Sequence, residues 1–472
     1  MNPVPATSYT GGRYSASKGA LRNRVWSSVY GMAVLALLFV YIYSPPFLLM
    51  PFGPVKLIAV LGLVYIAIFK RNLMFNFLRI REVQISILCY LLGLLYAFGI
   101  DGMNDWTTFR SYSMLLFLVE VIPCSLFLSI LITEGPFKDN SSILRFVLAV
   151  AALQGVAATG LFYFPSWNYQ LNGEMLRHGE ATELSMFRYD YADYRGYGIS
   201  GNYFFSMPVF QSVGVLCCMV LAIRRSYLYT VAILPILAAI VLNARVGLVT
   251  GAIAVLGIVA YAVVKETWRK GLCLLCFALT LLCCAYGFVA YETEKADSRF
   301  LKNSNWLKRS AQDATAPEVV AEFWIAPHNI WLGDGHDIFL DVDDLGRNSD
   351  NGYVQSLFYG GLVFSLFLYG GFLALVVGAY RATVEKSAKA MVIVLLAMVV
   401  VGNVKGDLLG NSNETVRGAF LLLIFYILNR ATVRTRKGCW QDRVHPPQGR
   451  EEEITNQATA LRVQHPAPAM QP

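Results

Sequence analysis

The sequence predicts an all-α fold, a polytopic integral membrane protein built as a bundle of about 12 transmembrane helices. Hydrophobic residues make up 56% of the 472-residue chain and charged residues only 15%, whereas soluble globular proteins carry about 25% charged residues. The apolar residues come in blocks of roughly 17–25 residues, long enough to cross a hydrocarbon core about 30 Å thick. Because backbone groups in hydrocarbon must be hydrogen-bonded within each segment, we expect these blocks to be helices.

Twelve apolar blocks divide the chain. They cover residues 26–43, 54–69, 83–100, 113–133, 142–164, 204–223, 226–242, 246–264, 271–290, 353–379, 388–402 and 415–429. The predicted segments are a basic N-terminus (1–25), helices one to five (26–164), a first large loop (165–203), helices six to nine (204–290), a second large loop (291–352), helices ten to twelve (353–430) and a tail (431–472). The tail is rich in Pro, Gln and charge, which predicts disorder.

Lys and Arg are unevenly divided between the two sets of connections. One set holds Arg13, Lys18, Arg22, Arg24, Lys70, Arg71, Arg79, Arg81, Lys138, Arg145, Arg224, Arg225, Lys265, Arg269, Lys270, Arg381, Lys386 and Lys389. The other set holds only Lys56, Arg110, Arg245, Lys405 and Arg417. The positive-inside rule therefore places both termini in the cytoplasm and both large loops outside. The net charge of +8 is explained by this basic face, whose partner is anionic membrane lipid, and no nucleic acid is expected.

The cysteines indicate packing and not a disulfide framework. Eight of the nine lie in apolar blocks, and Cys439 lies in the tail. Cys273 and Cys276 form a CxxC inside a predicted membrane helix, where packing is a better explanation than a metal or redox site.

Three arginines on the outer side are candidates for binding an anion. Arg188 and Arg195 lie among many tyrosines in the first large loop, and Arg binds phosphate with two parallel hydrogen bonds while aromatic faces stack on sugar rings. An aromatic belt at the headgroup level is the alternative. Arg245 has no basic neighbour at the junction of helices seven and eight, where it snorkels to headgroups, pairs with an acid or binds an anion.

The second large loop ends in "GDGHDIFLDVDDLGRNSD" (333–350), directly before an apolar helix. Asp341, Asp343 and Gly346 have the spacing of a calcium loop, but Leu345 and Gly352 occupy two essential ligand positions, so no metal site is expected. A carboxylate such as Asp350, at the mouth of an apolar bundle, is suited to act as a general base or to position a hydroxyl. A solvated acidic loop is the alternative.

Four motifs resemble the bacterial O-antigen polymerase and ligase superfamily. "SDNGYVQSLFYGGLVFSLF" (349–367) is similar to the family signature, in which a polar pair precedes a Tyr, an apolar run, Gly-Leu and a membrane helix. "WLGDG" (331–335) resembles the family's Gly-x-Gly, "NARVGL" (243–248) its Ser-Arg-x-Gly-Leu, and "YRGYGISGNYF" (194–204) its Arg-containing segment. Asp350 stands where ligases carry His, which favours a polymerase.

The resemblance implies a polysaccharide polymerase of the bacterial inner membrane, with a GT-C-like architecture, two periplasmic loops and no cofactor. It would join oligosaccharide repeat units carried on undecaprenyl pyrophosphate, with a chain-length regulator as a possible protein partner. Arg188, Arg195 and Arg245 would bind the pyrophosphate, and Asn351 and Tyr353 would contact substrate. Asp350 is the first choice for the base; His328 and His336 are the reserve.

Two alternatives remain open. A ligase of the same fold would transfer the finished polymer to a terminal acceptor. A transporter or flippase for lipid-linked glycans would carry charged residues near the middle of its helices and internal repeats. Glu120 is the main mid-helix charge in the sequence, and no repeat is evident.

Overall fold

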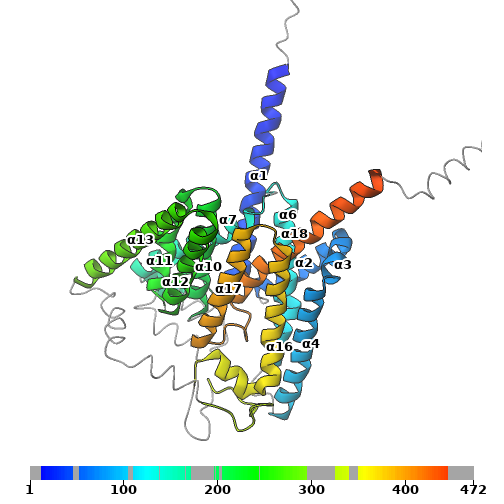
Figure 1. Ribbon diagram of the computed structural model, residues 1–472, viewed down its shortest axis with the longest axis vertical. Coiled ribbons are helices and arrows are strands. Elements are labelled where there is room, and N and C mark those ends of the chain that lie inside the picture. The colour runs from blue at the N-terminus through cyan, green and yellow to red at the C-terminus, as the bar shows by residue number, and fades with distance from the viewer. Residues whose placement is uncertain are drawn as a thin grey trace, which may run out of the picture.

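The computed structural model describes residues 12–45, 53–104, 110–137, 139–164, 166–171, 196, 198–200, 205–243, 245–294, 325–339 and 349–444. The regular secondary structure in these ranges is helical, with no strand among them (Figure 1). The prediction of a helical polytopic membrane protein is thereby confirmed at the level of its architecture. Within the same ranges, eight helices are long and apolar enough to cross a membrane, or nine if the bent pair α2 and α3 counts as one span.

The helices follow the twelve apolar blocks. They are α1 (Gly12–Tyr43), α2 (Pro54–Phe69), α3 (Arg71–Leu78), α4 (Arg81–Met103), α5 (Arg110–Leu116), η1 (Phe117–Val121), α6 (Ile122–Glu134), α7 (Ser142–Tyr163), α10 (Ser206–Arg224), η2 (Tyr227–Ala232), α11 (Ile233–Val241), α12 (Arg245–Tyr261), η3 (Ala262–Glu266), α13 (Trp268–Glu294), α16 (Gly352–Ala382), α17 (Lys386–Gly402), η4 (Asn403–Lys405) and α18 (Glu414–Val444). Each block coincides with one helix or with a continuous run of these elements, while the count of twelve spans stays a prediction.

Three helices differ from the sequence-based expectation. α18 continues to Val444, whereas disorder was predicted from residue 431; the segment contains no proline before Pro446, so nothing in its backbone stops the helix earlier. α3 was not predicted, and it bends by 102° from α2. α16 was predicted as one uninterrupted helix, but Gly360 and Gly361 have non-helical backbone angles and break it.

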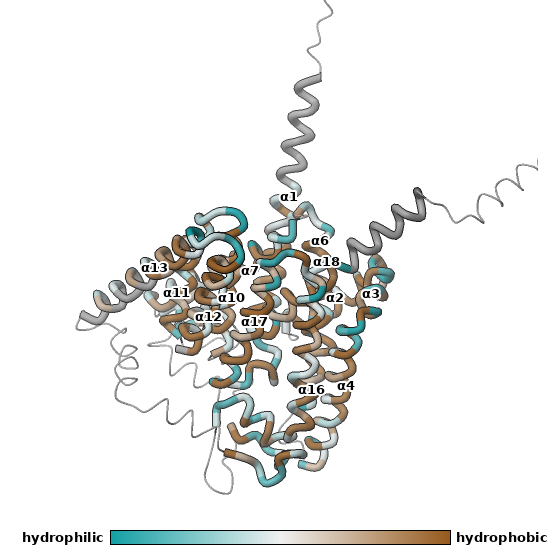
Figure 2. Tube along the Cα trace, in the orientation of Figure 1, coloured by the Kyte–Doolittle hydropathy of each residue, from teal (hydrophilic) through white to brown (hydrophobic). Residues whose placement is uncertain are grey.

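The connections that carry most of the Lys and Arg residues lie together at one end of the bundle, here called the basic end (Figures 1 and 2). Side chains from different connections pair there: Lys70 with Glu134, Arg381 with Glu82, Arg225 with Asp139, Arg224 with Glu385, and Asn429 with Asn140. These pairs bring several of the basic connections together at one end, while the division of all connections between two faces and the side of the membrane that this end occupies stay predictions.

The opposite end, here called the loop end, gathers the remaining described connections. The start of α16 and the segment 325–339 lie there, at the bottom of Figure 1. Contacts across this end join Asn104 with Gly335, Ser113 with Asn411, Tyr353 with Val400, and Asn243 with Gly196.

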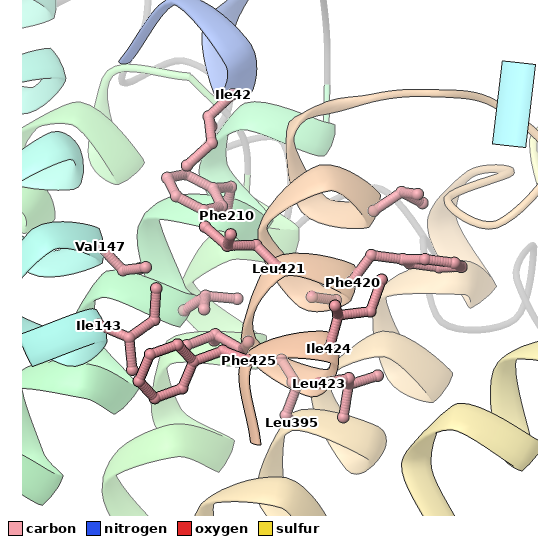
Figure 3. Packing of buried hydrophobic residues seen from close by; sticks show 14 of the residues in the cluster. Ile42, Ile143, Val147, Phe210, Leu395, Phe420, Leu421, Leu423, Ile424 and Phe425 are labelled. Atoms are coloured by element: carbon pink, nitrogen blue, oxygen red, sulfur yellow. The ribbon is translucent and has the colours of Figure 1, made fainter. Parts of the chain in front are cut away.

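Two adjacent helices, α10 and α18, form the centre of the bundle. Every residue from Ala419 to Leu428 of α18 is buried, as is every residue from Ser206 to Ala222 of α10, so these two stretches are covered on all faces. This explains why the apolar residues of these helices are not confined to one face. Figure 3 shows side chains of α18 packed among Phe210 of α10, Ile143 and Val147 of α7, Leu395 of α17 and Ile42 of α1.

Candidate functional site

The break in α16 lies near the loop end, after a short N-terminal arm formed by residues 352–359. Gly360 has φ −138° and ψ 16°, and Gly361 has φ 63° and ψ −160°. The Gly361 conformation is essentially restricted to glycine, because a side chain at this φ and ψ clashes with its own backbone. A break in a helix frees backbone groups that must find other partners when they are buried.

The segment 330–335, here called the docked segment, satisfies a carbonyl of the break. Phe358 would accept the helical hydrogen bond of Leu362 in an unbroken helix. Instead, its carbonyl accepts from the backbone N–H of Asp334 at 2.7 Å and of Gly335 at 3.1 Å.

The same segment accepts hydrogen bonds from two N–H groups at the break. Leu362 N–H donates to the carbonyl of Ile330 at 2.9 Å, and Val363 N–H donates to that of Trp331 at 3.2 Å. The docked segment therefore replaces one turn of helical hydrogen bonding. This explains why the polar loop leads directly into an apolar helix.

Three glycines allow this close approach of backbone to backbone. A Cβ at Gly361 would overlap the carbonyl of Trp331, and a Cβ at Gly333 would lie 2.6 Å from the nitrogen of Gly361. Gly333 and Gly335 both have positive φ, at 75° and 81°. The motifs WLGDG and YGGL, recognised separately in the sequence, are thus two halves of one contact.

His328 and Asp334 form a pair at the entrance to the docked segment. Asp334 Oδ2 lies 3.2 Å from His328 Nδ1 and also accepts the backbone N–H of His328 at 2.9 Å. The His328 side chain is 80% exposed, whereas that of Asp334 is 14% exposed. A carboxylate on one ring nitrogen fixes the orientation of the imidazole and leaves Nε2 facing outward, an arrangement suited to general base catalysis.

Asp350 lies at the start of the arm, beside Lys405 of η4. Its Oδ2 is 2.5 Å from the Lys405 ammonium, and its Oδ1 is buried with no hydrogen-bond partner in the part of the chain that the structure describes. Both side chains are partly exposed, 33% for Asp350 and 43% for Lys405. The carboxylate predicted as a base is therefore held in an ion pair at the loop end.

The other predicted residues near Asp350 hold the arm in place. Asn351 is the fully buried N-cap of α16, and its side-chain oxygen accepts the backbone N–H of Tyr353 at 3.0 Å. Tyr353 donates its hydroxyl to the carbonyl of Val400 in α17 at 2.8 Å. His336 lies edge-on against Phe358, with its Nε2 buried and without a partner among the described residues.

A buried cluster around Arg110 links four parts of the loop end. The guanidinium pairs with Asp407, which follows η4, and lies 3.3 Å from Asp337 and 3.3 Å from Gln355 of the arm. The Arg110 side chain is 6% exposed. One guanidinium thus faces two carboxylates, and the cluster ties α5, the segment 325–339, the arm and the connection from α17 to α18 together.

Two further acids are buried away from this cluster. Glu120, in the π-helix η1, lies 2.9 Å from Arg417 of α18, and both side chains are almost completely buried. Glu414, at the start of α18, accepts hydrogen bonds from Ser200 and, at 2.6 Å, from Ser206. π-Helical turns occur frequently at functional sites, which makes η1 a second region of interest.

The remaining predicted site residues are only partly described. Arg188 and Arg195 lie outside the described residues, as do Asp341 and Asp343. Arg245 is the first residue of α12, at the loop end, but its side chain also lies outside the described part. Within the described ranges, no three His, Cys, Asp or Glu side chains are grouped so that they could hold a metal ion.

Sequence reasoning missed Arg110, Asp337 and Asp407 as a group. Their only signal was that Arg110 and Asp407 lie near the ends of apolar blocks and that Asp337 belongs to the polar stretch before an apolar helix. Because Arg110 and Asp407 are almost 300 positions apart in the chain, no local pattern indicates that they meet.

No protein-family model matches the sequence, and no curated protein matches it either.

Proposed function

We propose that this protein is a glycosyltransferase of the bacterial inner membrane that polymerises oligosaccharide repeat units carried on undecaprenyl pyrophosphate. The reaction would take place at the loop end, on the periplasmic side. The reducing-end sugar of one lipid-linked chain is transferred to a hydroxyl of the next unit, and undecaprenyl pyrophosphate leaves. The four motifs of the sequence support this proposal by resemblance.

One observation supports it most strongly. A polar segment inserts into a broken membrane helix and so presents His328 and Asp350 at the same end of an apolar bundle. A donor with a polyprenyl chain needs apolar surface for its lipid and polar groups at the level of its pyrophosphate. Discontinuous membrane helices expose backbone groups that bind polar or charged ligands, as in transporters.

The geometry divides the proposed roles between two pairs of residues. His328, oriented by Asp334 and open at Nε2, is placed to accept the proton of the acceptor hydroxyl. The Asp350 carboxylate is neutralised by Lys405, so we assign it to binding a sugar hydroxyl, and we assign the Lys405 ammonium to the leaving pyrophosphate. Arg188, Arg195 and Arg245 remain proposed pyrophosphate ligands.

The test replaces His328 by Gln and, separately, Asp350 by Asn in cells that carry only the variant protein. Loss of a general base lowers a rate by about 10²–10⁴-fold, so His328→Gln should abolish long chains while the protein stays in the membrane. Asp139→Asn, a change of the same type at the basic end, is the matched control. A gel of surface glycans is compared with an extract of lipid-linked glycans.

The pattern of products separates the polymerase from the ligase. Loss of a polymerase leaves single repeat units on the final acceptor, because another enzyme still transfers them. Loss of a ligase leaves the acceptor bare, and long lipid-linked chains accumulate. Normal long chains on the surface in both variants would refute the proposed enzyme.

A lipid-linked glycan transporter is the second candidate, favoured by the buried charges and the broken helix. Glu120 and Arg417 lie within the bundle, and Glu414 is buried among hydroxyls, features that occur along transport pathways. This candidate predicts that repeat units accumulate on the cytoplasmic side in a Glu414→Gln variant, whereas an enzyme predicts that they reach the periplasm.

A further inference from the structure

A cavity of about 940 Å³ opens at the basic end, far from the loop end. Its wall is formed by the parts of α3, α4, α16, α17 and α18 that lie at the basic end. The lining residues are Asn76, Arg79, Ile80, Arg81, Glu82, Gly378, Tyr380, Arg381, Ala382, Lys389, Ile427 and Arg430. The volume lies within the roughly 300–1,000 Å³ that is usual for small-molecule sites.

The lining is strongly basic and incompletely neutralised. Five cations face a single carboxylate, Glu82, which pairs with Arg381 at 2.8 Å. Arg79 and Arg81 are exposed, and neither has a carboxylate partner among the described residues. Lys389 lies over the ring of Tyr380, 5.1 Å from its centroid, and has no carboxylate partner among the described residues. Four positive charges are therefore in excess.

The backbone at the cavity also favours an anion. α4 begins at Arg81, where Ile80 at the N-cap offers no side-chain acceptor and the Glu82 carboxylate accepts one backbone N–H of the first turn. The other N–H groups of this turn and the helix dipole attract negative charge. Because α4 has 23 residues, its dipole is fully developed.

Apolar residues also line the cavity, where α16 packs closely against α4 and α18 at Gly378. Gly378 lies between α4 and α18, where a Cβ would be 3.0 Å from Cβ of Glu82 and 3.2 Å from Cδ1 of Ile427. Ile427 is buried and, with Ile80 and Ala382, adds hydrocarbon to the lining of the cavity. A ligand that fills this space is charged at one part and apolar at another.

We propose that this cavity binds the phosphate group of an anionic lipid headgroup. The position of the cavity at the ends of membrane helices places it at headgroup level, where a positively charged pocket between helices selects such lipids. Farther along the helices that form its walls, exposed side chains are apolar, including Ile85 and Leu88 of α4 and Leu373 of α16. A free phosphate ion would leave both the apolar lining and these flanking surfaces unused.

The test measures lipid retention by the full-length protein purified in detergent, using native mass spectrometry with added phosphatidic acid or phosphatidylcholine. Each basic residue near an anionic lipid contributes about fivefold in affinity, so Arg79→Gln combined with Arg81→Gln should weaken phosphatidic acid binding about thirtyfold. Phosphatidylcholine binding should not change. Arg145→Gln combined with Arg225→Gln, at the same end but outside the cavity lining, is the matched control and should retain the lipid.

A second variant covers the case in which the first fails to fold. Arg79→Lys with Arg81→Lys keeps both charges but loses the planar guanidinium, and it should bind phosphatidic acid more tightly than the Gln variant and less tightly than the unchanged protein. Equal retention by all variants would overturn the site. Displacement of phosphatidic acid by inorganic phosphate at equal concentration would overturn the assignment to a lipid, since the hydrocarbon would then contribute nothing.

Discussion

Replacing Gly361 by Ala should release the docked segment from α16. Gly361 has φ 63° and ψ −160°, a region that residues with a side chain do not adopt without strain. The new Cβ would also overlap the carbonyl of Trp331 and lie 2.6 Å from the nitrogen of Gly333. Both neighbours are backbone atoms of the docked segment, so the clash cannot be relieved by turning a side chain.

The size of the effect follows from two competing terms. Backbone strain of this kind costs about 1–3 kcal/mol. Undocking breaks four hydrogen bonds, each worth about 0.5–1.5 kcal/mol net, and lets the helix close two of its own in their place. Because the helix regains two of the four hydrogen bonds, the strain decides the size of the effect. We expect the docked state to become less stable relative to the open state by about 1–3 kcal/mol, which raises the population of the open state about 5- to 150-fold.

Hydrogen exchange of the backbone amides measures this opening directly. In the Gly361→Ala protein, the amides of Asp334 and Gly335, which lose their acceptor on undocking, should exchange faster by the factor given above, while those of α18 should not change. Gly370→Ala is the matched control in the same helix, since its Cβ would meet only Cys89 Sγ at 3.9 Å. Unchanged exchange at Gly335 in the Gly361 variant would refute the docking argument.

Three further predictions concern buried charge and orientation. Arg110→Gln should destabilise the protein by about 3–5 kcal/mol, because Asp407 and a second carboxylate are left buried without compensation. The stability of Arg110→Lys should lie between that of the Gln variant and that of the unchanged protein. Equal midpoints of thermal unfolding in detergent for all three proteins would contradict this. Glu120→Gln should also lower the free energy of unfolding by about 3–5 kcal/mol, because Arg417 is left buried without its partner. Combining it with Arg417→Met should lower the free energy of unfolding by less than Glu120→Gln alone. If the losses of the two single variants add up in the double variant, the pair is not coupled. A reporter that is active only outside the cytoplasm should be silent when fused near residue 225 or 385 and active near residue 320, and activity at residue 225 would overturn the assignment of the basic end to the cytoplasm.

The helices were predictable because their signal is local. An apolar run of about 20 residues can cross a bilayer only as a helix, so the blocks at 54–69 and 142–164 locate α2 and α7 to within a residue at each end. The break in α16 has a weaker local signal. Gly360 and Gly361 interrupt an apolar run, but glycine is common in membrane helices, and nothing nearby in the sequence indicates that a segment some thirty residues earlier inserts there.

The residues of the candidate site were selected from the sequence, but their contacts were not predictable. Asp350, His328 and His336 were recognised because polar residues gather just before an apolar helix. Their different environments depend on partners from other parts of the chain: Lys405 pairs with Asp350, whereas His336 packs against Phe358. Such pairings are set by the three-dimensional packing, which a residue pattern does not contain.

By itself, the sequence determined the helical architecture and the gathering of Lys and Arg at one end, since both depend on composition summed over short stretches. Only the tertiary structure decided that Arg110 is buried between Asp337 and Asp407 and that the docked segment replaces a turn of α16. The physical reason is that a buried charge or a freed backbone group must be satisfied by whatever partner lies near it. That partner is fixed by the packing of helices distant in sequence, and so no local rule predicts it.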